Sequence, residues 1–261
     1  RLSEIKAAEW QVMQRYMHHD GCLMQFLSSE LDDPNTAPCG KCANCNPTGS
    51  LLATVSHEMG LAAAEFLENV FIEIEPRKML DCVDFPIDRF PRLLNSQGLL
   101  CETGRALCQW GEAGWGEIAK AGKEAGRFDP RLADAAAKLI TRRWHPDPFP
   151  TWVTYVPSHR HNELVANFAK QLAAKLDIPC VAAVTKVRRN QQQKFMQNTQ
   201  FRCNNLDGVF EIEALRSSGP VLLVDDAVDS KWTFAVIGAL LRRAGAGPVY
   251  PFAIMSTATR G

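Results

Sequence analysis

Cys22 and the run Cys39-Gly40-Lys41-Cys42-Ala43-Asn44-Cys45 decide how the first part of this 261-residue chain folds. Three cysteines at a repeat of three residues cannot pair comfortably with one another as disulfides. Pro38 and Gly40 supply turn chemistry that can point their sulfurs at one centre. A fourth thiolate, from Cys22, completes the tetrahedral set of a structural zinc site, with no open position for water. The alternative is a group of reduced cysteines without a metal.

The segment from Arg15-Tyr16 through Cys22 to Cys45 resembles the zinc-binding module that follows the motor of RecQ-family DNA helicases. The resemblance covers about the first fifth of the chain. It implies a four-cysteine zinc site beside a helical hairpin, in residues 1–47. The apolar spacing of residues 1–31 independently predicts helix, interrupted near Asp20-Gly21. Because four cysteines fill the site, His18 and His19 are expected to pack or to face solvent.

Composition limits the class of protein. Apolar residues make up 46% of the chain, enough for a sizeable core. There is no apolar run of the ~20 residues that a membrane-spanning helix needs, and no signal-peptide pattern opens the sequence. Nine cysteines that include a zinc-like cluster fit a reducing compartment, so a cytoplasmic location is expected. Since the chain starts at Arg1 within a helical pattern, we expect a fragment of a longer protein.

The net charge is zero, but the charges are not evenly distributed. Residues 151–205 contain 8 Lys and Arg against 2 Asp and Glu, whereas residues 51–110 contain 5 against 9. A module that grips DNA through its phosphates usually has a basic surplus. DNA binding by the middle segment alone is therefore expected to be weak. The later basic segment suits an anionic ligand or nucleic acid.

Residues 48–108 give a weaker signal. Pro47-Thr48-Gly49-Ser50 has the composition of a linker, and a helix is expected after it. The buried stripe of that helix is expected to be Ala62, Ala63, Phe66, Leu67 and Val70. In RecQ-family helicases a winged-helix module occupies this place, so the resemblance implies a winged-helix-like domain. Its candidate phosphate contacts, which a solvated polar face explains equally well, are Arg77, Lys78, Arg89 and Arg92.

The last part of the chain, residues 109–261, alternates helix and strand. The glycine-rich stretch Gly104–Phe128 is expected to form turns around a short helix. A helix over 131–143 is predicted, with Asp129 as its cap and Pro130 in its first turn. Further helices are predicted over 164–176 and 232–244, and strands over 152–156, 180–184, 221–224 and 249–255. This alternation predicts an α/β domain with a parallel, covered sheet. The polar stretch 186–205 is expected to be an exposed flap.

A second candidate site begins where the strand Pro220–Val224 runs into Asp225 and Asp226. A loop of hydroxyl and charged residues then leads into a helix. Its candidate ligand-binding residues are Asp229, Ser230, Lys231, Trp232 and Thr233. Loop N–H groups and a helix N-terminus attract an anion such as phosphate. Phosphate would repel the paired acids, so these are expected to take sugar hydroxyls or a metal. The alternative is a turn capped by Asp229 and Ser230 that binds nothing.

These residues resemble the phosphoribosyl-pyrophosphate (PRPP) loop of type I phosphoribosyltransferases, and residues 110–261 are most similar to the ComF branch. The resemblance implies that Asp225 and Asp226 hold the ribose hydroxyls and that Asp229–Thr233 holds the 5′-phosphate. Val156–Arg160 would approach the pyrophosphate, with magnesium. The family has glycine where this chain has Lys231. A lysine adopts positive φ angles less readily than a glycine does. The lysine side chain either crowds the pocket or contacts an anion directly.

The three segments in series resemble the C-terminal region of RqlH-type bacterial RecQ-like helicases. The resemblance implies a parent enzyme that unwinds DNA 3′ to 5′ using ATP, with DNA, the ATPase motor and a phosphorylated small molecule as partners. The motor would lie upstream, since these residues contain no G-x-x-x-x-G-K-[ST]. Three hypotheses follow: an accessory module whose phosphoribosyltransferase-like domain is a sensor or docking surface, an active phosphoribosyltransferase, or a ligand-free interaction domain.

Overall fold

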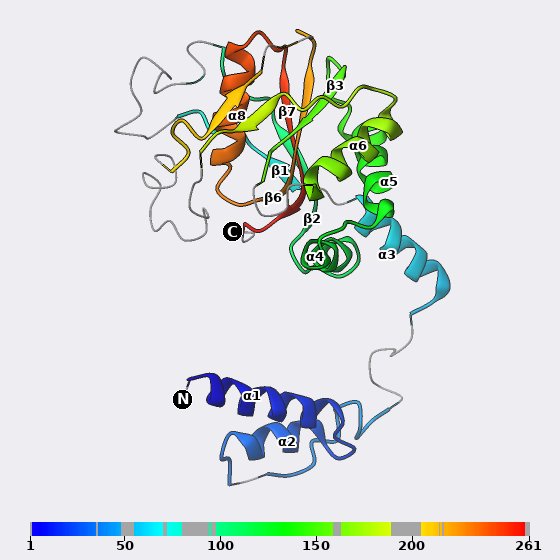
Figure 1. Cartoon of the computed structure of the whole chain (residues 1–261). Coiled ribbons are helices and arrows are strands. Elements are labelled where there is room, and N and C mark those ends of the chain that lie inside the picture. Colours follow the sequence, from blue (N-terminus) through cyan, green and yellow to red (C-terminus); the bar gives the residue numbers. More distant parts are fainter. Residues whose placement is uncertain are drawn as a thin grey trace. The chain divides into compact units, whose positions relative to one another are not determined.

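The computed structural model describes residues 2–34, 36–47, 55–69, 72–79, 94, 98–158, 163–188, 205–213, 215 and 217–258. The chain divides into two compact units, Arg1–Asn69 and Val70–Gly261, and each is described by itself (Figure 1). Within the described residues, no helix has the length and apolar character needed to cross a membrane.

The N-terminal unit begins with a helical hairpin. Helices α1 (Leu2–Met17) and α2 (Leu23–Glu30) are separated at the predicted interruption. An Arg15–Glu30 ion pair of 3.1 Å links the two helices. Among the described residues of this unit, only Cys22 is buried. Hydrophobic burial therefore contributes little to the cohesion of this unit.

Helix α3 (His57–Asn69) completes the N-terminal unit. The expectation of a buried stripe on this helix is wrong for Ala62, Ala63 and Phe66, which are exposed. Leu67 and Val70 lie outside the residues whose burial the structure describes. A helical apolar period identifies the apolar face of a helix but does not supply the element that would cover it.

The C-terminal unit is built on a five-stranded sheet in the order β1-β2-β7-β6-β3. The strands are β1 (Ile72–Ile74), β2 (Gly104–Gln109), β3 (Trp152–Tyr155), β6 (Val221–Val228) and β7 (Val249–Ser256). Only the β1–β2 pair is antiparallel; β2, β7, β6 and β3 run parallel. All residues of β7 are buried, as expected of a central strand covered on both faces. The predicted mixed α/β architecture with a mainly parallel sheet is confirmed.

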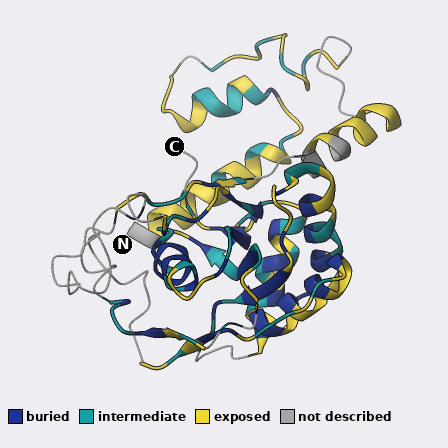
Figure 2. Cartoon of the chain, turned by 90° about the horizontal axis from the view of Figure 1, so that it is seen from above, coloured by how far each residue is buried: buried dark blue, intermediate teal, exposed yellow. Residues whose placement is uncertain are grey.

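Helices cover both faces of this sheet (Figure 1). Helix α8 (Trp232–Arg243) packs on one face, where Val221 and Leu223 of β6 point. On the other face, Leu222 and Val224 pack with α5 (Pro130–Leu139) and α6 (Leu164–Leu176), and α4 (Trp115–Ala125) joins them. Successive strand residues point to opposite faces, so one strand feeds both cores. Figure 2 shows the buried residues in dark blue along these strands and inner helix faces.

Strands β1 and β2 fall within residues 48–108, which were predicted to be winged-helix-like. Both belong to the sheet of the C-terminal unit, and the predicted boundary at 108/109 falls inside β2. Residues 80–93 of this segment lie outside the described residues, and the winged-helix assignment stays a prediction. Strand β2 was not expected, because the stretch that begins at Gly104 was predicted to form turns around a short helix. Gly104 is needed there, since a Cβ at this position would clash with the backbone carbonyl of Pro251 in β7.

The strand predicted over 180–184 is also different in the structure. Only Cys180 bridges to Val153 of β3. The regular strand is β4 (Val184–Lys186), which pairs antiparallel with β5 (Phe210–Ile212) in a separate two-stranded sheet. Most of the stretch that was expected to be a flap, residues 189–204, lies outside the described residues.

Candidate functional site

The structure gathers the four predicted zinc ligands. The sulfur atoms of Cys22, Cys39, Cys42 and Cys45 all lie within 4.8 Å of one another, and those of Cys42 and Cys22 are 3.9 Å apart. A tetrahedral site with Zn–S bonds of about 2.3 Å has its sulfurs about 3.8 Å apart. The four thiols therefore fit a zinc ion, although zinc binding itself stays a prediction.

Backbone N–H groups surround these sulfurs. Cys39 and Gln25 donate to Cys22 Sγ at 3.2 and 3.4 Å, and Cys42 and Lys41 donate to Cys39 Sγ at 3.2 and 3.4 Å. The N–H groups of Cys39 and Gln25 lower the pKa of the Cys22 thiol. For Cys42, burial opposes ionisation, but backbone N–H groups and the neighbouring cysteines outweigh it and lower the pKa to about 6. This environment favours the thiolate form of Cys22 and Cys42, the form that binds metal. The hydrogen bond with Cys42 instead raises the pKa of the Cys45 thiol to about 12 in the absence of a metal.

Asn44 ties the cysteine run to the turn between α1 and α2. Its Nδ2 donates to the carbonyl oxygens of His19 and Gly21, at 2.5 and 2.8 Å. The imidazole of His19 packs on the ring of Phe26, with centroids 4.9 Å apart. His19 thus packs against a neighbour, as expected of a histidine that is not a ligand.

In the second candidate site, β6 is longer than predicted and includes both carboxylates. Asp225 and Asp226 are consecutive strand residues, so their side chains start from opposite faces of the sheet. Lys123 of α4 places its Nζ 3.0 Å from Asp226 Oδ2. The Asp226 N–H donates to Asp225 Oδ1 at 2.8 Å. Burial, and then the negative charge of Asp226, raise the pKa of Asp225 well above its usual range.

Asp229, Ser230 and Lys231 connect β6 to α8. Lys231, the residue just before α8, has φ 66° and ψ 2° and so adopts the left-handed conformation. This is the position where the PRPP loop that the sequence resembles has glycine. The backbone thus keeps the conformation that favours glycine, at a cost of about 1 kcal/mol for a lysine. Thr233 follows in the first turn of α8 and is half-buried, as is Ser230.

Arg77, from the segment after β1, holds this loop. Its guanidinium donates to the Ser230 carbonyl oxygen at 3.2 Å. The guanidinium carbon also lies 3.7 Å from the centroid of the Trp232 ring. Trp232 is only 1% exposed, so its ring packs in the core instead of lining the loop. Arg77 was a candidate DNA-phosphate contact, and the structure instead shows it against the candidate phosphate loop.

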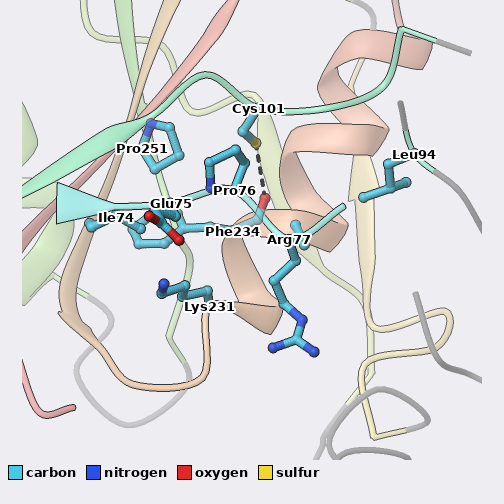
Figure 3. Close-up of a pocket in the computed structure, with 10 residues that line it drawn as sticks. Ile74, Glu75, Pro76, Arg77, Leu94, Cys101, Lys231, Phe234 and Pro251 are labelled. Atoms are coloured by element: carbon cyan, nitrogen blue, oxygen red, sulfur yellow. Dashed lines mark hydrogen bonds between the residues drawn. The ribbon is translucent and has the colours of Figure 1, made fainter. Parts of the chain in front are cut away.

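Figure 3 shows the pocket beside this contact. It is lined by residues of β1 and the segment after it, of the β6–α8 loop and of α8, among them Glu75, Arg77, Lys231 and Phe234. The sequence could not reveal that these segments meet, because Arg77 and Ser230 are 153 residues apart. No local motif marks such a contact.

The carboxyl ends of the parallel strands bring the remaining candidate residues to the same edge of the sheet. Val156 follows β3 and donates its N–H to the Val224 carbonyl oxygen at 2.9 Å. The segment Val156–Arg160, which was predicted to approach pyrophosphate, thus begins next to β6. Its residues 159 and 160 lie outside the described residues. Open α/β sheets bind ligands at the carboxyl ends of their strands.

No protein-family model matches the chain, and no curated protein matches it. Among solved structures, adenine phosphoribosyltransferase from Leishmania tarentolae is similar at 15% identity and a TM-score of 0.33, covering 49% of this chain and 72% of that protein. The enzyme from Leishmania donovani matches at 16% identity and a TM-score of 0.32, covering 49% and 66%. A further adenine phosphoribosyltransferase is similar at 18% identity and a TM-score of 0.34, and the match covers 49% of this chain and 71% of that protein. At TM-scores below 0.5 this likeness carries no assignment of function.

Proposed function

We propose that the C-terminal unit binds a phosphorylated ribose of the PRPP class at the carboxyl edge of its sheet. The observation that carries this proposal is the left-handed backbone of Lys231 between β6 and α8. A lysine is strained in this conformation, and strained backbone residues cluster at ligand-binding sites. The strained residue lies between a carboxylate pair and the N-terminus of α8, which supports a phosphate-binding turn at this loop.

The chemistry of the edge suits such a ligand. The first N–H groups of α8 and the hydroxyls of Ser230 and Thr233 are donors for a phosphate. Asp225 and Asp226 are acceptors for sugar hydroxyls, because an ionised carboxylate accepts and does not donate. Magnesium, when present, would neutralise the pyrophosphate of PRPP.

For the N-terminal unit we propose a structural zinc site. Four thiolates occupy all positions of a tetrahedral ion, so zinc there would fold the unit and would not activate water. The support is the convergence of the four sulfurs in a unit whose described residues include no other buried side chain than Cys22.

For the chain as a whole we propose an accessory region of an ATP-dependent 3′–5′ RecQ-like DNA helicase. The zinc module would support an upstream motor, the winged-helix-like segment 48–108 would contribute weak DNA contacts, and the C-terminal unit would be a sensor or docking module. The order of a four-cysteine cluster and a mainly parallel α/β unit in one chain supports this proposal. The intact carboxylate pair also favours a second candidate, an active PRPP-dependent phosphoribosyltransferase.

Titration calorimetry with PRPP and magnesium tests the ligand. We expect heat of binding for the wild type and a large loss of affinity in Ser230→Ala/Thr233→Val, which removes two phosphate donors. Thr141→Val, on the surface of the same unit, is the control. No heat at millimolar PRPP would contradict the proposal. Binding without base-dependent release of pyrophosphate supports a sensor, whereas such release supports the enzyme.

A further inference from the structure

Lys123, which sequence reasoning did not single out, contacts the carboxylate pair directly. Its Nζ lies 3.0 Å from Asp226 Oδ2, and the two side chains are 27% and 18% exposed. The same ammonium lies 5.7 Å from the ring centroid of Trp110, at the end of β2. Lys123 is in the last turn of α4, where a cation is also favoured by the helix dipole. The ammonium is therefore held in place at the edge of the sheet.

The two carboxylates are poorly arranged to chelate a metal together. Their side chains start from opposite faces of β6, and one oxygen of Asp225 is already used by the Asp226 N–H. A divalent cation such as Mg²⁺ requires several oxygens in near-octahedral geometry. Burial lowers the pKa of Lys186 and the negative charge of Asp225 opposes that shift, so Lys186 of β4 also interacts with Asp225. Each of the two carboxylates therefore interacts with a lysine ammonium.

We propose that Lys123 determines the ligand specificity of this edge of the sheet, because its ammonium is a permanent counter-ion of Asp226. With its charge balanced by an ammonium, Asp226 accepts hydrogen bonds from an uncharged vicinal diol, and no divalent cation is needed there. A carboxylate has about four lone-pair sites, so the contact with Lys123 leaves acceptors for sugar hydroxyls. Lys123 acts through Asp226 and is a positioning residue. This inference rests on the proposed function of the same site.

Ribose 5-phosphate is the probe, because it carries the diol and the 5′-phosphate but no pyrophosphate to bind magnesium. For the wild type we expect equal affinity in magnesium-free buffer and in millimolar Mg²⁺. Lys123→Met keeps the length of the side chain and removes the charge. Its affinity should fall roughly tenfold without magnesium, the loss of about one charged hydrogen bond. Lys120→Met, on the same helix, should behave as the wild type.

Two outcomes of this titration would overturn the inference. One is a wild type that requires Mg²⁺ to bind ribose 5-phosphate. The other is a Lys123→Met variant that binds as the wild type does. In the second case Lys123 has only a structural role or none.

A ligand-free measurement separates this inference from the proposed function. The groups that act on the buried Asp225 carboxyl are Asp226, Lys123 and Lys186, and Lys123 lowers its pKa. Carboxyl ¹³C NMR should therefore show the Asp225 titration midpoint shifted upward in Lys123→Met and unchanged in Lys120→Met. An unshifted midpoint in Lys123→Met would overturn the role of Lys123. If the midpoint shifts but the wild type binds neither ribose 5-phosphate nor PRPP, the proposed function fails instead.

Discussion

Different interactions stabilise the fold within each of the two units of this chain. In the described part of the N-terminal unit only Cys22 is buried, and four sulfurs converge beside a two-helix hairpin. The C-terminal unit buries apolar side chains on both faces of one sheet. The first arrangement is typical of modules that draw their folding free energy from a metal, and the second of domains stabilised by hydrophobic burial. The following experiments test this difference.

Removal of a zinc ligand should have the largest effect. In Cys39→Ala we expect the N-terminal unit to lose its fold completely, because three thiolates leave the ion incompletely held, while the C-terminal sheet survives. Limited proteolysis with mass spectrometry, alongside measurement of bound zinc, gives both results. Cys180→Ala, outside the cluster, is the control. Wild-type protease resistance of residues 2–47 in Cys39→Ala would argue against a metal-dependent unit.

Shortening a core side chain of β6 should destabilise the C-terminal unit and leave the N-terminal unit unchanged. Leu222 is fully buried beneath α5 and α6, so Leu222→Ala should cost about 2–5 kcal/mol of unfolding free energy in the C-terminal unit. Bound zinc should not change. Leu61→Ala is a matched control, because Leu61 is 58% exposed. Chemical denaturation measures the cost, and loss of zinc from Leu222→Ala would show that the two units do not fold independently.

Asp225→Asn should stabilise the C-terminal unit at neutral pH. The folded-state pKa of Asp225 is raised above its unfolded value, so its favourable contribution is fully present below about pH 3.9 and is lost as the pH rises through the folded pKa. At pH 8 the variant should therefore be more stable than the wild type. The difference should vanish near pH 3. Asp134→Asn, on the surface, serves as control, and parallel pH profiles of Asp225→Asn and wild type would contradict the prediction.

The smallest effect is expected at the loop. Lys231→Gly should raise the unfolding free energy by about 0.5–1 kcal/mol, because glycine adopts positive φ without a Cβ penalty. Lys231→Ala removes the same charge but keeps the penalty, so it isolates the backbone effect. Thermal unfolding of both variants measures the difference. Equal melting temperatures for the two would mean that the backbone of residue 231 is not strained.

Local signals in the sequence predicted much of the fold. Asp129 accepts the Arg131 N–H at 2.9 Å and Pro130 opens α5, as the capping pattern indicated. The alternation of strand and helix from residue 152 onward identified β3, α6, β6, α8 and β7. The cysteine spacing identified the cluster because three cysteines at intervals of three residues, with a fourth 17 residues upstream, are typical of a metal site.

The rest depended on contacts between distant segments. Strand β2 is defined by its pairing with β7 and by the close approach of Gly104 to Pro251, neither of which leaves a local pattern. The partners of the candidate phosphate loop and of the acid pair, Arg77 and Lys123, were missed for the same reason. An isolated basic residue in a sequence does not indicate which acid or carbonyl it will meet.

The pairing of β2 with β7 determines where the C-terminal unit can be cut for study. A fragment that starts at residue 109 would lose β1 and nearly all of β2, and would expose the backbone donors and acceptors along one side of β7. An uncovered, largely apolar edge of this kind can pair with other chains, so this fragment should aggregate. It would also lack Arg77, and with it the support of the loop before α8. Expression from residue 70 preserves both the sheet edge and this support.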